Sequence, residues 1–238
     1  QPESSAASDV YKRQGLYKSI EVISLYGKKR KISNEDIEGI DVIVFDIQDV
    51  GVRFYTYLST LHYAMEASSR TNKKIIILDR PNPNSFYIDG PVLEIENSSF
   101  IGLHPVPIVY GMTIGEYGKM INGEGWLENK TKANLEVIRI KNYNHNLKYE
   151  PPVRPSPNLP NLQSIYLYPS LAFLEKTEVS VGRGTKIQFQ IYGHPNFISD
   201  FSFTPKPNFG SQYPKLNGKL SFGEDLRNYK TKDKIELK

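Results

Sequence analysis

Two short apolar runs flank an amphipathic segment in the first half of the chain. Residues 41–47 (DVIVFDI) and 74–79 (KIIILD) are nearly continuous hydrophobic stretches, as in strands that are buried on both faces. Between them, residues 57–69 repeat apolar side chains at spacings of three and four, which is typical of a helix with one buried face. This order predicts a β-α-β unit with parallel strands and a right-handed crossover.

Further segments continue this alternation of strands and helices. Thr113 and Glu116 form a capping-box sequence that predicts a helix to about Asn122. The other expected elements are a strand at 20–25, a short helix that begins in the capping sequence 33–36, a strand at 135–140, a helix at 162–174 with a break at Pro169, a strand at 179–185 that runs into a glycine turn, and a strand at 188–192. The pattern as a whole predicts an α/β protein.

A proline-rich stretch divides the chain. Residues 151–160 contain five prolines, which stiffen the backbone and prevent a helix or an inner strand. We interpret this stretch as a rigid linker or the wall of a site. It separates an expected first domain over residues 15–150 from an expected second α/β subdomain over residues 151–238.

The first residues have a different origin from the rest. Residues 4–14 (SSAASDVYKRQ) are the translation of a common transposase sequencing adapter. We therefore exclude residues 1–14 from the fold, as an artefact, and expect the native sequence to begin at about Gly15. The last residues, 230–238, have no terminating pattern, and we expect a cut edge there as well.

The composition is that of a globular protein. Hydrophobic residues make up 39% and charged residues 24% of the 238 residues, which excludes a disordered chain. No apolar run is long enough to predict a membrane span. The net charge of +4 is scattered along the chain, so we expect no nucleic-acid partner. The absence of cysteine excludes disulfides, thiolate metal sites and a cysteine nucleophile.

Two carboxylates and an arginine follow the first apolar run. Asp46, Asp49 and Arg53 come at the place where ligands bind in open α/β sheets, the carboxyl ends of the strands. Asp46 and Asp49 suit an acid, a base or an electrostatic stabiliser, and a carboxylate pair is the usual device of glycosidases. Arg53 offers a planar fork for a substrate carboxylate. The structural alternatives are that Asp46 caps a loop and that Asp49 pairs with Arg53.

A second polar group follows the next predicted strand. Arg80 and Asn82 lie in the sequence DRPNP, whose prolines stiffen a turn. Because the two strands are expected to be parallel, this turn should lie beside the first group. Glu116 is a further carboxylate, but its spacing from Thr113 satisfies the N–H groups at a helix start, and we expect a capping role.

A glycine-rich turn and four histidines complete the candidates. Residues 182–185 (GRGT) suit an anion, because glycines let the backbone approach a ligand. Neither a phosphate-binding P-loop nor a dinucleotide fingerprint is present, so we predict no nucleotide cofactor. Histidines 62, 104, 145 and 194 fit no metal spacing, so we predict no metal site. A lone histidine is usually structural, and His194, in the sequence YGHP, is the best suited of the four to a site.

Five motifs occur in a fixed order. They are FDIQDVGVRFYTY (45–57), DRPNP (79–83), GMTIGE (111–116), SPNLP (156–160) and GRGT (182–185). Together they resemble a bacterial family formerly described as a domain of unknown function and now represented by exo-β-N-acetylmuramidases of the NamZ type. The resemblance covers roughly residues 20–228.

The resemblance implies a fold, an activity and a location. The fold would be a Rossmann-like parallel sheet with helices on both faces, plus part of a smaller α/β subdomain. The activity would be exo-acting hydrolysis that releases β-1,4-linked N-acetylmuramic acid from the non-reducing end of peptidoglycan fragments, without a cofactor. Members are usually exported. The expected partners are peptidoglycan-derived muropeptides or disaccharides and, in the full-length protein, a second copy.

The resemblance also suggests which residues contact the sugar. Arg53 and Arg183 are candidates for the lactyl carboxylate of muramic acid, because an arginine fork matches a carboxylate. The tyrosines offer apolar faces for a sugar ring and hydroxyls for polar contacts. The expected substrate-binding residues are Arg53, Tyr55, Tyr57, Asn82, Tyr110, Ser156, Asn158, Arg183 and His194, and the expected catalytic candidates within the chain are Asp46 and Asp49.

The chain departs from the family pattern in three respects. A Pro-Glu-His-Gly motif that supplies the best candidate for the family's catalytic glutamate does not occur in it, and a C-terminal portion of the family also has no counterpart. Where many members have histidine before Gly-Met-Thr, this chain has Tyr110. We therefore expect the chain to be an inactive fragment of an active enzyme.

Two other classes of function stay open. One is a metal-dependent enzyme that handles phosphate, with Asp46 and Asp49 as oxygen ligands of magnesium. The other is a non-catalytic protein that binds cell-wall carbohydrate. Loss of activity on chelation would favour the first, and muropeptide binding without sugar release would favour the second.

Overall fold

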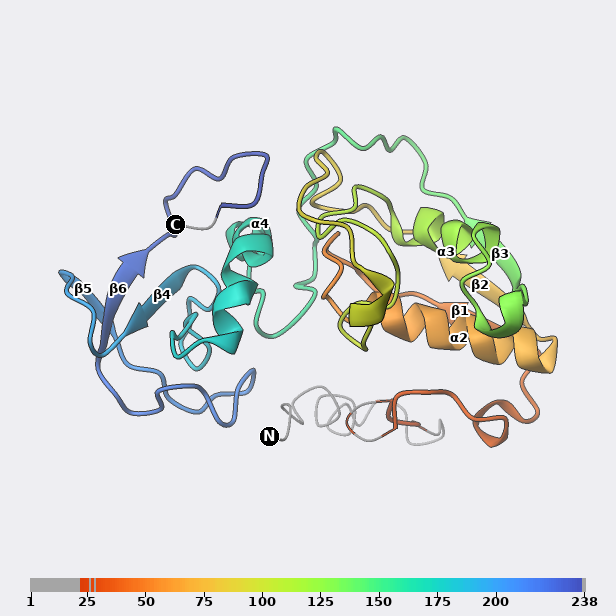
Figure 1. Ribbon diagram of the computed structural model, residues 1–238, viewed down its shortest axis with the longest axis horizontal. Helices are drawn as coiled ribbons and strands as arrows, with labels where there is room; N and C mark the ends of the chain where they lie inside the picture. The colour runs from red at the N-terminus through yellow and green to blue at the C-terminus, as the bar shows by residue number, and fades with distance from the viewer. Residues whose placement is uncertain (1–21, 26, 28, 237–238) are drawn as a thin grey trace. The chain divides into compact units, whose positions relative to one another are not determined.

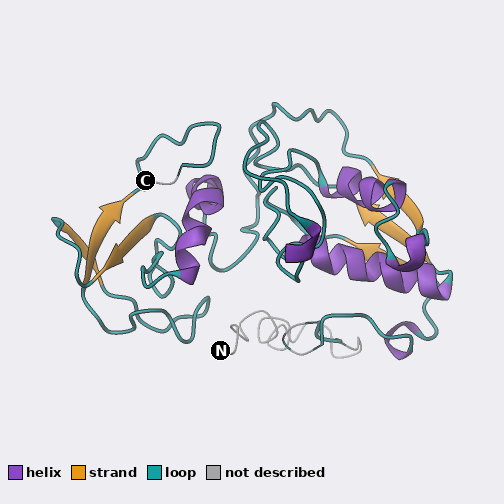
Figure 2. Ribbon diagram, in the orientation of Figure 1, coloured by secondary structure: helices purple, strands orange, loops and turns teal. Residues whose placement is uncertain are grey.

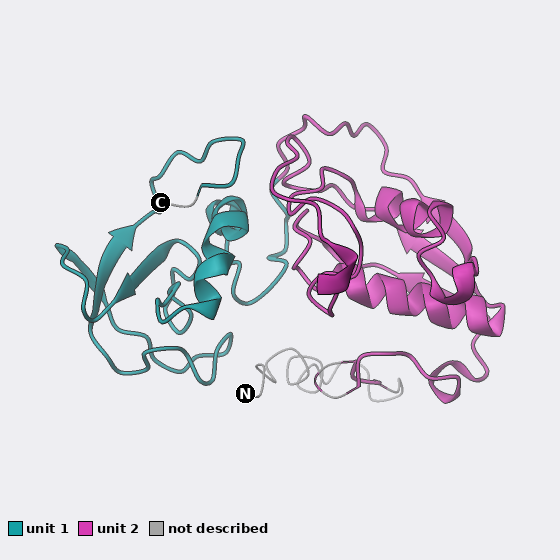
Figure 3. Ribbon diagram, in the orientation of Figure 1, with its two compact units in different colours: residues 1–18, 150–238 teal, residues 19–149 magenta. Residues whose placement is uncertain are grey.

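The chain divides into two compact units, one within residues 19–149 and one within residues 150–238 (Figure 3). The structure is a computed structural model, which describes residues 22–25, 27 and 29–236. The expected adapter segment, residues 1–14, lies outside the described residues.

The first unit is built on a parallel three-stranded sheet. Strands β1 (Val42–Phe45), β2 (Lys74–Leu78) and β3 (Asn134–Ile138) lie in the order β1-β2-β3 (Figure 1). Val42 pairs with Lys74, and Lys74 pairs with Asn134 on its other side, so all three strands begin at one edge of the unit. The parallel β-α-β arrangement predicted from the apolar runs is confirmed.

Both helices of this unit pack on the same face of the sheet. Helix α2 (Tyr57–Thr71) and helix α3 (Ile114–Gly123) share one hydrophobic core with alternate residues of the strands. The core consists of Phe45, Leu58, Leu61, Ala64, Met65, Ile75, Ile77, Val106, Tyr110, Ile114, Tyr117, Ile121, Leu127 and Ala133. The α/β class is therefore as predicted.

The other face of this sheet differs from the expectation. Val44 is 57% exposed and Ile138 is 47% exposed, although both are large apolar residues. The expectation that strand 41–47 is buried on both faces is wrong, because only the face with Phe45 is covered. Among the described residues, the helices lie on one face and not on both.

The two helices begin where their sequences predict and end one or two residues beyond the expected positions. Thr113 accepts a hydrogen bond from the backbone of Glu116, and Glu116 accepts one from Thr113, so the predicted capping box opens α3. Helix α2 ends at Asn72, which adopts the left-handed conformation that favours asparagine and glycine. Gly118 brings α3 close to the sheet, since a Cβ there would lie 2.5 Å from the Ile77 side chain.

Short 3-10 turns connect these elements. They are η1 (Glu35–Ile37), η2 (Ile95–Asn97) and η3 (Glu128–Lys130). Turn η1 starts in the predicted capping sequence, where Ser33 and Asp36 hydrogen-bond to each other. Of the strand expected at 20–25, residues 20 and 21 lie outside the described residues, and residues 22–25 form no strand.

The second unit combines an antiparallel sheet with one helix (Figure 2). Strands β4 (Ile191–His194), β5 (Phe201–Phe203) and β6 (Ser221–Asp225) lie in the order β4-β6-β5. Gly193 and Gly223 face each other across β4 and β6, and a Cβ on Gly223 would lie 1.8 Å from a backbone oxygen. The close approach of these two strands therefore requires glycine.

Helix α4 (Leu162–Leu171) does not break where the sequence suggested. It runs through Pro169 and continues as the 3-10 turn η4 (Ala172–Lys176). Proline removes one backbone N–H near the end of the helix, and the buried side chains of Ile165 and Tyr168 hold the last turn against the core. Within the described residues, no helix has both the length and the apolar character needed to cross a membrane.

The glycine turn expected in 179–185 forms, but the strand before it is reduced to an isolated bridge, and the strand expected at 188–192 begins at Ile191. Gly182 and Gly184 have φ of 78° and 83°, which turns the chain away from an extended path. Phe189 also has a positive φ, of 55°, so the regular strand begins only at Ile191. Ser180 still forms an isolated bridge with Gly193.

Candidate functional site

Polar side chains gather where the parallel strands of the first unit end. Strand β1 is followed by residues 46–53, and strand β2 is followed by residues 79–85. The N-terminus of α3 lies at the same edge, because Asp79 accepts hydrogen bonds from Thr113 and Gly115. This is the position at which open α/β sheets bind ligands.

Asp49 is the most perturbed carboxylate of this edge. Its side chain is 3% exposed, and one oxygen, Oδ1, has no hydrogen-bond partner among the described residues. The other oxygen accepts hydrogen bonds from the Gly51 amide, at 2.6 Å, and from the Tyr110 hydroxyl. Burial raises the pKa of Asp49 to about 6, although both hydrogen bonds act in the opposite direction. A buried acid with a pKa near neutrality is suited to proton transfer.

Tyr110 connects Asp49 to the core. Its ring is buried and meets the ring of Tyr117 edge to face, with centroids 5.0 Å apart. Burial and the neighbouring Asp49 carboxylate raise the pKa of Tyr110 well above its usual value. Tyr110 therefore stays protonated and acts as a hydrogen-bond donor to Asp49.

Asp46 has a different environment from Asp49. Its carboxylate forms an ion pair with Arg80, whose Nη2 lies 2.6 Å from Oδ1, and both side chains are partly exposed. Exposed pairs of this kind contribute little to stability, about 0–1 kcal/mol. The two candidate carboxylates thus have separate partners. One structural alternative was an Asp49–Arg53 pair, but Asp49 bonds to Gly51 and Tyr110 instead.

Arg53 binds the protein's own backbone. Its Nη1 donates hydrogen bonds to the carbonyl oxygens of Pro91, at 2.9 Å, and of Val106. The backbone N–H of Arg53 also donates to Ile108, at 2.8 Å. Arg53 therefore ties the segment after β1 to the segment that leads to Tyr110. These contacts support a structural role, and its role toward a substrate stays a prediction.

Asn82 is held inside the same edge. Its Oδ1 accepts a hydrogen bond from the Asn84 amide and its Nδ2 donates to the Met112 carbonyl, both at 2.8 Å. Gly51 has a φ of 76° and lies so close that a Cβ would be 2.2 Å from Asn82 Oδ1. Asn82 thus fixes the two loops against each other.

The carboxylates around α3 serve its N-terminus. Glu116 accepts hydrogen bonds from the Thr113 amide, at 2.9 Å, and from His145, at 2.8 Å, and its pKa is lowered although burial acts to raise it. Burial raises the pKa of Asp79, which accepts bonds from Thr113 and Gly115. The predicted capping role of Glu116 is confirmed.

Two predicted tyrosines lie at the start of α2. Tyr55 is buried, Tyr57 is half-buried, and their rings meet edge to face with centroids 5.1 Å apart. They belong to the same unit as Asp49, Asn82 and Tyr110.

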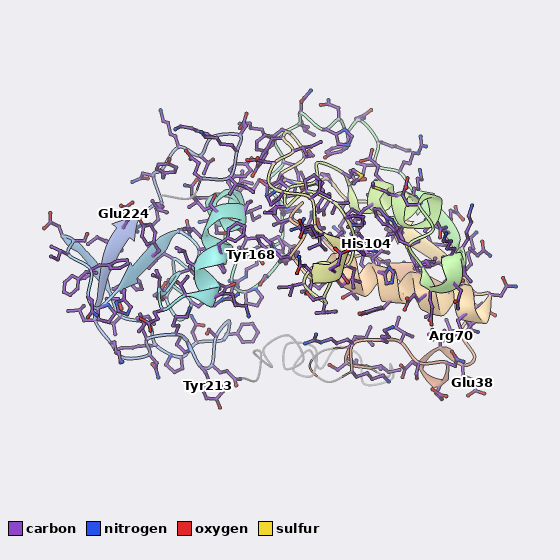
Figure 4. All side chains as sticks on the ribbon, viewed as in Figure 1. Glu38, Arg70, His104, Tyr168, Tyr213 and Glu224 are labelled. Carbon is purple, nitrogen blue, oxygen red and sulfur yellow. The ribbon has the colours of Figure 1, made fainter. Side chains whose placement is uncertain are left out.

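A buried histidine pair escaped the sequence analysis. His62 Nδ1 and His104 Nε2 lie 3.0 Å apart, His104 Nδ1 lies 3.1 Å from the Tyr117 hydroxyl, and His62 Nε2 lies 3.0 Å from Glu66. Trp126 stacks on His104, with ring centroids 4.7 Å apart. Figure 4 labels His104, which lies beside helix α2. The spacing of His62 and Glu66 on one helix face was visible in the sequence, whereas the contact with His104 was not.

The Glu66 carboxylate stands at one end of this series of side chains and fixes the direction of each hydrogen bond. If Glu66 is ionised, His62 donates from Nε2 and accepts at Nδ1. His104 then donates from Nε2 to His62 and accepts the Tyr117 hydroxyl at Nδ1. Burial lowers the pKa of His62 and lowers that of His104 to about 3, so both imidazoles are neutral near pH 7.

The remaining predicted residues belong to the second unit. Ser156 Oγ accepts the Asn158 amide at 3.1 Å, and buried Asn158 donates to the Gly210 carbonyl at 2.8 Å. Arg183 forms a two-pronged ion pair with Glu175 and lies over the ring of Phe189.

The structure therefore brings Asp46, Asp49, Arg53, Asn82 and Tyr110 into one unit and Ser156, Asn158, Arg183 and His194 into the other. Whether the two groups act on one substrate stays a prediction. In the described part of the chain, no group of three or more histidine, aspartate or glutamate side chains is arranged to hold a metal ion.

Comparisons with known proteins match both units. A family model described as "Exo-beta-N-acetylmuramidase NamZ, N-terminal" matches residues 2–163, and the corresponding C-terminal model matches residues 166–237. Peptidoglycan beta-N-acetylmuramidase NamZ of Bacillus subtilis (strain 168) is 42% identical over 181 residues, which cover 74% of this chain and 43% of that relative.

Two solved structures are also similar. Both are crystal structures of DUF1343 family proteins from Bacteroides fragilis NCTC 9343. One has a TM-score of 0.81 and 46% identity, and the match covers 84% of this chain and 57% of the solved chain. The other has a TM-score of 0.77 and 29% identity and covers 92% of this chain and 64% of its own. The chain thus spans less than two thirds of the length of each of these relatives.

Proposed function

The chain belongs to the NamZ exo-β-N-acetylmuramidase family, and we propose that the full-length protein is an exo-acting glycoside hydrolase of peptidoglycan fragments. Its product would be N-acetylmuramic acid, released from the non-reducing end. The observation that carries this proposal is that the N-terminal and the C-terminal family models both match, over nearly the whole chain. From the resemblance, the full-length protein would itself be exported and would act outside the cytoplasm.

The chemistry requires a proton donor and a second carboxylate. A glycosidase protonates the leaving oxygen with one acid and stabilises or attacks the sugar carbon with another group. Asp49 is the candidate in this chain for a proton-holding group, because burial raises its pKa to about 6. The best candidate for the family's catalytic glutamate belongs to a Pro-Glu-His-Gly motif that does not occur in this sequence. We therefore assign Asp49 an accompanying role and expect the chain alone not to turn over substrate.

A pair of chromogenic substrates tests this function. A protein that carries the Pro-Glu-His-Gly segment in front of this chain should release the chromophore from a β-N-acetylmuramide, without added metal. The matched β-N-acetylglucosaminide lacks only the lactyl group and should react far more slowly. The 238-residue chain should be slower by a factor of about 10²–10⁴, since a general acid contributes that much. Equal rates on the two sugars would contradict the proposed specificity.

A carbohydrate-binding function without catalysis is the second candidate. It is favoured by the surroundings of the two predicted catalytic groups, since Asp46 pairs with Arg80 and Asp49 is buried against Tyr110. If the extended protein binds muropeptides in a titration but releases no sugar over hours, this second function replaces the first.

A further inference from the structure

A pocket of about 570 Å³ lies within the second unit, away from the residues described above except His194. Its polar lining comes from Glu178, His194, Asn196, Lys215 and Lys219. This volume is within the range of sites that hold a small ligand, roughly 300–1,000 Å³. The pocket belongs entirely to residues 150–238.

The ammonium group of Lys215 is fixed in the wall of this pocket. Its Nζ lies 3.0 Å from the carbonyl oxygen of Glu175, 3.2 Å from that of Val179 and 3.4 Å from that of Leu174, and it also donates to Thr177. These carbonyls take up all three N–H donors of the ammonium group, so Lys215 contributes a positive charge at a defined point and no free hydrogen-bond donor. The charge needs no further ordering when a ligand arrives, which lowers the entropic cost of binding.

His194 presents a hydrogen-bond donor at the same place. It is the last residue of β4, so the sheet holds its backbone. Its Nδ1 accepts a hydrogen bond from the Asn196 amide at 3.2 Å. A neutral imidazole that accepts at Nδ1 carries its proton on Nε2. His194 therefore offers Nε2–H as a donor.

A strained turn brings a second cation to the pocket. Leu216 has a φ of 57°, a left-handed conformation that is costly for a leucine. Its carbonyl accepts the Lys219 amide at 3.0 Å, and Gly218, with a φ of 73°, completes the turn. Strain of this kind is commonly retained where a loop serves a ligand.

The charges of the lining select an acidic ligand. Lys215 and Lys219 outweigh Glu178, which leaves one net positive charge, while Glu178 and Asn196 can bind hydroxyl and amide groups. Nearby, Glu175 is paired with Arg183. We propose that this pocket binds the carboxylate of an acidic amino sugar, with Lys219 and His194 Nε2–H as hydrogen-bond donors to the carboxylate and the fixed charge of Lys215 beside it. This inference rests on the proposed function for its choice of sugar, muramic acid with its lactyl group.

A titration of the 238-residue chain tests the pocket directly. Amide shifts in an ¹⁵N-labelled sample are followed while N-acetylmuramic acid is added, and again with N-acetylglucosamine, which lacks the lactyl carboxylate. Saturable shifts confined to residues 177–178, 194–196 and 215–219 are expected with N-acetylmuramic acid. Binding of N-acetylglucosamine should be at least about tenfold weaker, the loss expected for a charge-assisted hydrogen bond. Equal affinities, or no shifts in these segments, would overturn the proposal.

Two substitutions, a matched control and a reserve variant assign the effect to the named groups. His194→Ala and Lys219→Met should each weaken binding of N-acetylmuramic acid by about two- to tenfold. Lys186→Met removes the same charge from an exposed residue of the same unit outside the pocket lining, and it should leave the affinity unchanged. Asn196→Ala provides a further variant if the His194 variant loses its native spectrum. Unchanged affinity in both Lys219→Met and Asn196→Ala would rule out the pocket.

The outcome is separable from that of the proposed function. The extended protein can lack muramidase activity while the 238-residue chain still binds the acidic sugar at residues 194–219. That result would support the pocket and contradict only the proposed enzymatic function. An active extended protein together with no amide shifts in this pocket would support the enzymatic function and contradict the pocket.

Discussion

Asp49 carries an ionisable group into the core of the first unit, at the end of a parallel strand. Its burial disfavours the charged form, and the Tyr110 and Gly51 hydrogen bonds offset that penalty only in part. The folded-state pKa of about 6 therefore lies above the ordinary value of 3.8. The protonated form is favoured by folding, so the stability gained is present below about pH 4 and is lost as the pH rises through 6.

Substitution of Asp49 by asparagine should abolish this pH dependence. The free energy of unfolding of the wild type, minus that of Asp49→Asn, should fall by about 2–3 kcal/mol as the pH rises from 3.5 to 7.5. Urea unfolding at several pH values measures it. Asp46→Asn serves as the control, because the exposed ion pair with Arg80 is worth about 0–1 kcal/mol. A difference for Asp49→Asn that does not change with pH would show that its pKa is not raised.

Arg53 allows the structural role to be separated from substrate recognition. Arg53→Ala removes the donor to the Pro91 and Val106 carbonyls and should lower the free energy of unfolding by about 1–3 kcal/mol. Thermal unfolding of the 238-residue chain is the measurement. A variant as stable as the wild type would contradict the structural role and favour binding of a substrate carboxylate by Arg53.

At the level of single residues, the sequence predicted positions better than partners. Polar groups after two buried strands were enough to locate Asp46, Asp49 and Asn82 at one sheet edge. The partner of Asp49 is Tyr110, which lies 61 residues further along the chain, and no local pattern contains that information. Burial, and therefore the raised pKa, was equally invisible.

Helix α3 lies against the sheet through one glycine and ends at another. A Cβ on Gly118 would lie 2.5 Å from Ile77, whereas a Cβ on Gly123 meets nothing within 4 Å. Gly118→Ala should therefore destabilise the protein by about 1–3 kcal/mol through overpacking. Gly123→Ala should be neutral or stabilise it by up to about 1 kcal/mol, because alanine loses less backbone entropy. Chemical denaturation compares the two, and a cost for Gly123→Ala as large as for Gly118→Ala would contradict this packing.

The His62–His104 pair joins α2 to the loop before α3 and should make this unit sensitive to acid. Lowered pKa values mean that the unfolded chain takes up protons first, so stability is present above about pH 6.5 and is lost as the pH falls. His62 contacts Glu66, which in turn pairs with Lys31, and His104 contacts the Tyr117 hydroxyl. Between pH 6.5 and 5, the wild type should lose about 2 kcal/mol relative to His104→Asn, which keeps an acceptor for Tyr117. Parallel pH profiles for the two proteins would contradict the neutral pair.

Elements with a local signal were predicted well, and elements fixed by packing were not. Apolar runs, helical spacing and the Thr113 capping box predicted β1, β2, β3, α2 and α3. The strand expected at 188–192 starts later, because Phe189 has a positive φ that its sequence does not announce. The helix through Pro169 continues because tertiary contacts outweigh the lost hydrogen bond.

For the whole molecule, family and fold class agree with the sequence, while the site is only partly visible in it. Five ordered motifs were enough to identify the family, and the two family models match residues 2–163 and 166–237. The apolar face with Val44 and Ile138 was not anticipated, because an apolar run does not reveal how many faces are covered. The candidate site residues lie in two units, which divide at residues 149 and 150.

The first products of hydrolysis show whether the protein is an exo-acting muramidase. The extended protein, in which a Pro-Glu-His-Gly segment precedes this chain, is incubated with peptidoglycan chains that end in muramic acid, and the products are followed by mass spectrometry from the first minutes. Free N-acetylmuramic acid should appear at once, while each remaining chain becomes shorter by this one sugar and then ends in N-acetylglucosamine, which a muramidase does not release. First products that are disaccharides or longer fragments, or no product at all from chains that end in muramic acid, would contradict an exo-acting muramidase.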